Sequence, residues 1–259
     1  MTTSSLWRPV SGCGMHCVPG GDTTARKLTT LVRMTGAAGV LLAGVLLVPL
    51  LRGTGVRTLA RLLLAALGVR LRWRGPAVKP GSLLVANHVS WLDVLALLAV
   101  APVRLVAKHE VGAWPLVGAV AKASGAIFLN RERPRQLPDA VADVAAALRS
   151  GRSVAVFPEG TTFCGAERGR FRPAVFQAAI DAQAPVVPIT IRYDTPAAAF
   201  IGDDTLWSSV RRVVALRGLT VTLVGSPALR PEAGADRRVL ARAAQASSGL
   251  PASSFSLAA

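Results

Sequence analysis

From about residue 79 onward, short apolar runs alternate with longer stretches that carry apolar residues at helical spacing. The short runs are rich in Val, Leu and Ile and are bounded by Gly, Pro or polar residues, as buried strands are. An alternation of this kind predicts an α/β fold with a mainly parallel central sheet flanked by helices. The predicted strands are 82–86, 104–107, 126–129, 153–157, 186–193 and 220–225, and the predicted helices are 91–100, 115–124, 135–150, 172–184 and part of 231–250.

The chain before residue 76 has a different pattern. Residues 1–33 are rich in Thr, Ser, Gly and Pro without a period, so we expect a disordered tail there. Residues 34–51 then carry no charge for 18 positions, the short limit of a membrane-spanning helix. A signal peptide is the competing interpretation, but no small-x-small cleavage site follows Leu51. A buried core helix is less favoured because the stretch contains several Gly residues and Pro49.

Residues 56–75 place leucines at helical spacing beside several arginines, a basic amphipathic pattern suited to a lipid interface. Between Asp22 and Asp93 there are ten Lys or Arg and no acidic residue. We therefore expect a membrane-associating helical segment over 34–75, arranged as a hairpin in the cytoplasmic leaflet, with a single span as the alternative. A catalytic domain is expected over 76–250 and a disordered end over 251–259.

Composition supports a membrane surface as partner. Of the 259 residues, 51% are hydrophobic, and the net charge is +16. Such a balance favours an anionic membrane over nucleic acid, because aromatics are only 5% and no nucleic-acid motif is present. Arginine-rich usage alone is the other explanation of the charge. The chain has three cysteines, and Cys13, His16 and Cys17 lack the second pair of ligands typical of zinc sites, so we expect no metal there.

Two polar turns that follow predicted strands carry the candidate chemistry: NHVSWLD (87–93) and FPEGTT (157–162). Histidine changes charge near neutral pH and suits a general base when a carboxylate backs it. His88 and Asp93 are five apart, about 140° on an ideal helix, so they can meet only if His88 lies in the turn before the helix. Ser90 and Asp93 also match a capping box, which gives Asp93 a purely structural alternative.

The chain carries two further sequence blocks, GAIFLNR (125–131) and VVPI (186–189). Together with NHVSWLD and FPEGTT, these four blocks in their order along the chain resemble the glycerolipid acyltransferases, the family that includes 1-acyl-sn-glycerol-3-phosphate acyltransferase. The resemblance covers about residues 75–230 and implies that His88 is the general base and Asp93 its partner. It implies substrate-binding roles for Arg131, Glu159, Gly160, Thr161, Lys108 and Arg172, with the Arg131 guanidinium on the acceptor phosphate.

The chain departs from the family pattern at two positions. Thr162 stands where the family often has Arg after FPEGT, and FRPA (171–174) stands where it often has Phe-Lys-x-Gly. The charge is kept at Arg172, but the glycine is lost. This FPEGTT variant is similar to the branch that acylates lyso-ornithine lipids.

The resemblance implies a membrane O-acyltransferase that moves a fatty acyl chain from acyl-CoA or acyl carrier protein to the free hydroxyl of a lysolipid. The leading acceptor is 1-acyl-sn-glycerol-3-phosphate, giving phosphatidic acid, and a lyso-ornithine lipid is the alternative. We expect no cofactor and no nucleic-acid partner, with the protein at the cell membrane and its active site on the cytoplasmic side. Three other functions stay open: a Ser-His-Asp hydrolase, although no G-x-S-x-G elbow is present; a non-catalytic membrane-binding module; and a metal enzyme using His88, Asp93 and Glu159.

Overall fold

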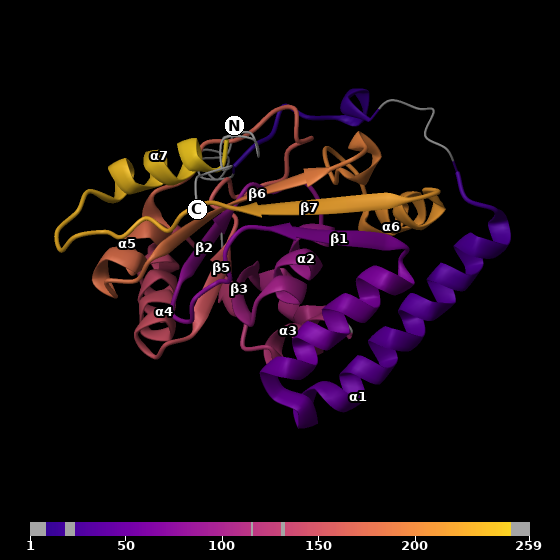
Figure 1. The fold of residues 1–259 in the computed structure, drawn as a ribbon, viewed down its shortest axis with the longest axis horizontal. Helices are drawn as coiled ribbons and strands as arrows, with labels where there is room; N and C mark the ends of the chain where they lie inside the picture. The colour runs from indigo at the N-terminus through magenta and orange to yellow at the C-terminus, as the bar shows by residue number, and fades with distance from the viewer. Residues whose placement is uncertain (1–8, 19–23, 115, 131–132, 250–259) are drawn as a thin grey trace.

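The computed structural model describes residues 9–18, 24–114, 116–130 and 133–249 (Figure 1). Within them, the predicted apolar runs form the strands of one sheet. The strands are β1 (Val69–Arg74), β2 (Leu83–Ala86), β3 (Val103–Lys108), β4 (Ile127–Leu129), β5 (Ser153–Val156), β6 (Val186–Tyr193) and β7 (Leu219–Gly225). Their order in the sheet is β1-β7-β6-β2-β5-β3-β4.

The sheet is mainly parallel, as the sequence predicts. Neighbouring strands run parallel from β6 through β2, β5 and β3 to β4. At the other edge, β7 is antiparallel to β6, and β1 is parallel to β7. The carboxyl ends of the five parallel strands therefore share one edge of the sheet, where open α/β sheets place their ligands.

Helices cover both faces of the sheet. They are α1 (Lys27–Ala66), α2 (Leu92–Val100), α3 (Val117–Ala123), α4 (Leu137–Arg149), α5 (Ala174–Asp181), α6 (Leu206–Ala215) and α7 (Arg237–Ser247). Side chains alternate between the faces of β2: Leu84 and Ala86 join the core beneath α1, α2 and α6, while Leu83 and Val85 join the core beneath α4, α5 and α7. Burial on both faces explains why the central strands are continuously apolar.

The helix α1 is folded back on itself. Gly36 lies against Ala66, and Gly44 lies against Leu59, whereas a straight helix would separate residues 36 and 66 by about 45 Å. Figure 1 shows the two antiparallel arms in indigo and purple along one side of the molecule. The hairpin expected from the sequence is therefore present, although it starts earlier and ends earlier than the expected segment 34–75.

The two arms of α1 differ in burial. The second arm buries its apolar residues against the sheet and α2. The first arm, Lys27–Leu47, is long and apolar enough to cross a membrane, and almost none of it is buried. Its exposed apolar side chains are Leu28, Leu31, Val32, Leu42, Leu46 and Leu47. Such a surface is stable beside lipid and unfavourable in water.

The expected interfacial helix over 56–75 is only partly present. The helix ends at Ala66, and 69–74 forms the edge strand β1 instead. Its sequence VRLRWR alternates apolar and exposed positions, the period of a strand rather than of a helix. Arg57 and Arg61 donate hydrogen bonds to the Ala99 carbonyl at 3.2 and 2.9 Å, so they bind the carboxyl end of α2 rather than lipid.

The expected disordered tail over 1–33 also differs from the structure. Residues 9–18 are ordered, with a short 3-10 helix at Met15–Cys17, and α1 already begins at Lys27. Cys13 is buried in a small apolar cluster with Val89 and Ile201. The segment has no hydrophobic period because its contacts are with loops near the end of β2 rather than with one face of a helix or sheet. Elsewhere in the chain, helix α6 (Leu206–Ala215) forms in a stretch for which the sequence predicted no helix.

The hairpin contact gives a testable prediction. A side chain at Gly44 would meet Leu59 at 2.6 Å, whereas nothing lies within 4 Å of a side chain at Gly39 on the same arm. We expect Gly44→Leu to destabilise the protein by about 1–3 kcal/mol relative to Gly39→Leu, because Leu59 is buried and cannot move aside. Thermal unfolding of both variants in the same detergent measures this difference. Equal stability of the two would contradict the contact between the arms.

Candidate active site

His88 lies in the turn between β2 and α2. The strand ends at Ala86 and the helix begins at Leu92, so the turn brings together two residues that a continuous helix would hold apart. His88 Nδ1 is 2.9 Å from Asp93 Oδ2. The His88 side chain is 19% exposed and that of Asp93 is fully buried. The imidazole therefore reaches the surface while its carboxylate partner is shielded from water.

The Asp93 carboxylate accepts four hydrogen bonds. Besides the His88 ring, Oδ2 accepts the backbone N–H groups of Val89 at 2.6 Å and Ser90 at 2.9 Å. The other oxygen, Oδ1, accepts the Tyr193 hydroxyl at 2.5 Å. The sequence offered helix capping and imidazole orientation as alternatives for Asp93. Its carboxylate binds the His88 ring and the backbone of the turn before α2, whereas the N-cap residue of the helix, Trp91, makes no side-chain cap. The amino-terminal turn of α2 further favours its negative charge.

Tyr193 is a site residue that the sequence analysis missed. It is the single tyrosine of the chain and the last residue of β6. Burial, the nearby Asp93 charge and the hydrogen bond to Asp93 together raise the pKa of its hydroxyl well above the ordinary value. The hydroxyl therefore stays protonated and remains a donor to Asp93. The sequence signal that could have identified Tyr193 as a site residue is its position at the carboxyl end of the predicted strand 186–193.

Phe157, the first residue of FPEGTT, holds the imidazole from the side. Its ring stacks on that of His88 with centroids 3.9 Å apart and planes 12° from parallel. Phe157 follows directly after β5, the neighbour of β2 in the sheet. Stacking on Phe157 therefore fixes the plane of the His88 ring, and the hydrogen bond to Asp93 fixes the rotation of the ring within that plane.

Glu159 is turned into the protein rather than toward the surface, with an exposed fraction of 3%. One oxygen accepts the His88 backbone N–H at 2.7 Å and the other accepts the Gly169 backbone N–H at 3.0 Å. Burial raises the pKa of this carboxyl to about 7, against the opposing effect of those two hydrogen bonds. The side chain thus joins the second motif to the backbone of the first.

The residues that follow Glu159 also connect the second motif to neighbouring segments. Gly160 has a φ of +77°, which favours glycine, and Pro9 of the amino-terminal segment lies against it. Thr161 is half-buried beside it. The Thr162 hydroxyl donates to the Phe200 carbonyl, and the Phe163 N–H donates to the His88 carbonyl at 2.8 Å. Both backbone groups of His88 are therefore held by the second motif and by Phe163, the residue after it.

Two of the basic candidates, Lys108 and Arg172, lie at the same sheet edge. Lys108 ends β3, which is separated from β2 by β5, and its side chain is exposed. Arg172 is exposed as well, and its backbone N–H donates to the Pro158 carbonyl at 3.0 Å. Arg131 lies outside the described residues, two positions after the end of β4.

The arrangement suits proton transfer rather than metal binding at His88. The oxygens of Asp93 and Glu159 accept hydrogen bonds from N–H and O–H donors. A cation among those donors would face their partial positive charges. The pair instead matches a base whose tautomer and orientation are set by a carboxylate.

Comparison with known proteins agrees with this geometry. The family model described as acyltransferase matches residues 70–192, which include both motifs. A solved structure, the 1-acyl-sn-glycerophosphate acyltransferase from Thermotoga maritima, superposes with a TM-score of 0.67 at 20% identity, covering 85% of this chain and 92% of that one. The expected α/β fold with a mainly parallel sheet is thereby confirmed.

Two curated relatives are closer in sequence. A 1-acyl-sn-glycerol-3-phosphate acyltransferase from Neisseria meningitidis is 37% identical over 181 residues, 66% of this chain and 69% of the relative. A lyso-ornithine lipid O-acyltransferase from Pseudomonas aeruginosa is 38% identical over 195 residues, 72% of this chain and 73% of the relative. The chain therefore belongs to the glycerolipid acyltransferase family and is an O-acyltransferase.

Proposed function

We propose that this enzyme transfers a fatty acyl group from a thioester, acyl-CoA or acyl carrier protein, to the hydroxyl of 1-acyl-sn-glycerol-3-phosphate, giving phosphatidic acid. The observation that carries the chemistry is the His88–Asp93 contact of 2.9 Å, with the carboxylate buried and the imidazole partly exposed. The relative named for this acceptor, 37% identical, supports the choice of substrate.

In the proposed mechanism, His88 Nδ1 is committed to Asp93, so Nε2 takes the proton from the acceptor hydroxyl. The hydroxyl oxygen attacks the thioester carbonyl as that proton leaves, and Asp93 stabilises the imidazolium that forms. The tetrahedral intermediate then collapses, the carbon–sulfur bond breaks, and the imidazolium returns its proton to the departing thiolate. The substrate hydroxyl is itself the nucleophile, so no acyl-enzyme forms.

The acceptor is held by the basic edge of the sheet in this proposal. Arg131 binds the acceptor phosphate through its guanidinium, and Lys108 and Arg172 add positive charge. Gly160 and Thr161 line the approach to His88, and Glu159 acts by positioning the His88 backbone, which it contacts at 2.7 Å.

A second acceptor is supported by a specific observation. The relative from Pseudomonas aeruginosa, named for lyso-ornithine lipid, is 38% identical over a longer stretch than the Neisseria one. Thr162 stands at the position where the family resemblance implies an Arg. One fewer positive charge suits an acceptor that lacks a phosphate. The two acceptors use the same base and differ in the head group that is recognised.

The location of the enzyme follows from α1. Its unburied first arm inserts into the cell membrane. The exposed Arg26 and Lys27 at its start face anionic head groups, each adding about 1 kcal/mol when well placed. Because donors of this class are cytoplasmic, we place the active site on the cytoplasmic side. A base at the membrane surface then meets both the lysolipid and the acyl chain without either leaving the interface.

Removal of the base tests the proposed function. We expect His88→Ala to lower acyl transfer by about 10²–10⁴-fold, with folding and liposome binding unchanged, because α1 is intact. The assay supplies one labelled acyl-CoA with lysophosphatidic acid or lyso-ornithine lipid as acceptor. Transfer to lysophosphatidic acid that is lost in the variant supports the proposal. Normal turnover in the variant would contradict the mechanism, and transfer to lyso-ornithine lipid alone would make it the acceptor.

The pKa of Glu159 predicts a pH effect on stability. Since its folded value of about 7 lies above its ordinary 4.5, the folded state binds the proton more tightly. The resulting stability is fully present below about pH 4.5 and is lost as the pH rises to about 7. The loss is on the order of 3 kcal/mol.

Glu159→Gln keeps the shape of the protonated side chain but cannot titrate. We therefore expect the free energy of unfolding to fall less steeply in the variant than in the natural protein across that pH range. Denaturant unfolding of both proteins in one detergent at several pH values measures the difference. Parallel curves would show that Glu159 does not titrate there.

A further inference from the structure

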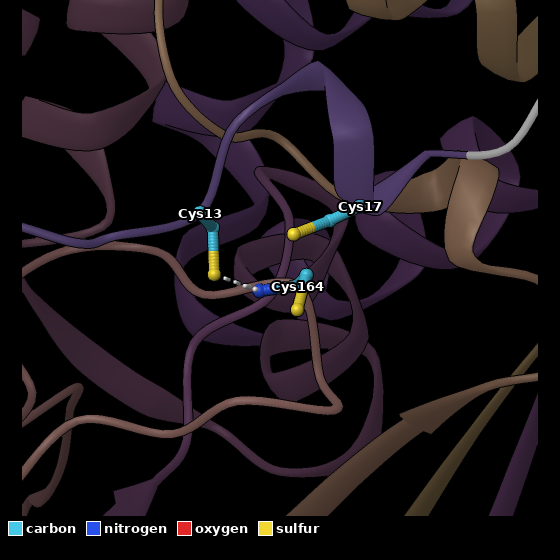
Figure 2. Close-up of side chains that lie close together, drawn as sticks. All are labelled: Cys13, Cys17 and Cys164. Atoms are coloured by element: carbon cyan, nitrogen blue, oxygen red, sulfur yellow. Dashed lines mark hydrogen bonds between the residues drawn. The ribbon is translucent and has the colours of Figure 1, made fainter.

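Three cysteines from two distant segments converge beside the active site (Figure 2). Cys13 and Cys17 belong to the ordered amino-terminal segment 9–18, and Cys164 lies in the loop that follows FPEGTT. Their sulfur atoms all lie within 4.8 Å of one another. The chain has three cysteines in total, so every thiol of the protein is at this point. The sequence showed Cys13 and Cys17 without a second pair of ligands, and the fold brings Cys164 to them.

Backbone N–H groups donate hydrogen bonds to two of the three sulfurs. The Cys164 N–H donates to Cys13 Sγ at 3.3 Å, drawn as the dashed line in Figure 2, and the Glu167 N–H donates to Cys164 Sγ at 3.4 Å. Backbone N–H donors of this kind stabilise a thiolate, the form that binds metals.

We propose that Cys13, Cys17 and Cys164 bind one Zn²⁺ through three thiolates. A tetrahedral site with Zn–S bonds of about 2.3 Å needs sulfurs about 3.8 Å apart. The observed separations reach that value after side-chain movements of about 1 Å or less, given their limit of 4.8 Å. Binding releases the proton of each thiol and involves no oxidation.

Glu167 is the fourth ligand in this site. Its Oε2 is 3.7 Å from Cys13 Sγ, close to the separation of two ligands on one tetrahedral zinc ion, about 3.5 Å for oxygen and sulfur. The side chain is exposed, and in this proposal it turns from its contact with Cys13 toward the other two sulfurs. Three thiolates are soft ligands that select Zn²⁺ over Mg²⁺ or Ca²⁺.

A disulfide explains the cluster less well than a metal does. One disulfide would join two of the cysteines and leave the third as a buried or half-buried thiol. A disulfide would therefore not explain why the third sulfur lies beside the other two. The meeting of all three sulfurs at one point is what a metal requires. A cytoplasmic active site, as proposed above, would also keep these thiols reduced.

The ion would attach the amino-terminal segment to the catalytic loops. Cys13 and Cys164 share a cluster with Val89, the residue after His88, and Pro9 lies against Gly160. A structural zinc here would therefore fix 9–18 across the turns that carry both motifs. The metal content of the protein is independent of its acyl acceptor, so the test below stands whether or not the proposed function is correct.

The test uses the tag-free full-length protein, purified in detergent with a phosphine reductant and zinc-supplemented growth. We expect mass spectrometry of the metal to find one zinc per chain. After removal of zinc, titration with Co²⁺ should produce the thiolate-to-cobalt charge-transfer absorption of a site with several sulfur ligands. Hydrogen exchange should be faster in both 9–18 and 161–169 of the metal-free protein than in the zinc-bound protein.

Variants identify the ligands. Cys13→Ser, Cys17→Ser and Cys164→Ser should each lower zinc affinity by at least about tenfold, and Glu167→Gln should lower it while keeping the cobalt–thiolate absorption. His16→Ala is the matched control, because His16 is exposed on the same segment, and it should bind zinc normally.

Three results would overturn the proposal. These are absence of stoichiometric zinc together with no cobalt–thiolate absorption in the natural protein, unchanged zinc affinity in any of the three serine variants, or a disulfide among these cysteines under the reducing purification. The cobalt titration needs no substitution, so a variant that fails to fold does not leave the question open.

Discussion

The structure depends most on the buried carboxylate of Asp93. A carboxylate out of water is stable only when hydrogen bonds replace its hydration, and here the donors come from the turn between β2 and α2 and from the end of β6. The same requirement orients His88, because its ring supplies one of those bonds at 2.9 Å. The geometry of the base is therefore a consequence of satisfying a buried charge, and it is already set before any substrate binds.

The two sequence motifs of the site form one interlocked unit. Glu159 accepts the His88 N–H at 2.7 Å, Phe163 donates to the His88 carbonyl at 2.8 Å, and Phe157 stacks on the ring. The second motif and the residue after it, Phe163, thus hold the backbone of the base, while Asp93 holds its side chain. The glutamate that the family resemblance assigns to the acceptor lies against the protein backbone instead, and we expect its effect on catalysis to come through the position of His88.

The sequence predicted most of the sheet, because strands buried on both faces, such as 83–86 and 186–193, are apolar runs whatever their neighbours are. It failed where contacts between distant residues decide. The arginines around 69–74 suggested an interfacial helix where the structure has an edge strand. Arg57 donates a hydrogen bond to a carbonyl 42 residues away. The hydrogen bond between Tyr193 and Asp93 joins residues 100 apart. Cys164 likewise meets Cys13 across 151 residues, a proximity that no local pattern contains.

The protonation state of the His88 ring tests the central claim most directly. With Nδ1 bound to Asp93, the neutral imidazole should carry its proton on Nδ1 and leave Nε2 as the base. Nitrogen NMR of the protein labelled at its three histidines distinguishes the two tautomers, and a His88 variant assigns the signal. We expect the Nδ1–H form in the natural protein, with loss of that preference in Asp93→Ala. A neutral His88 protonated on Nε2 would contradict it.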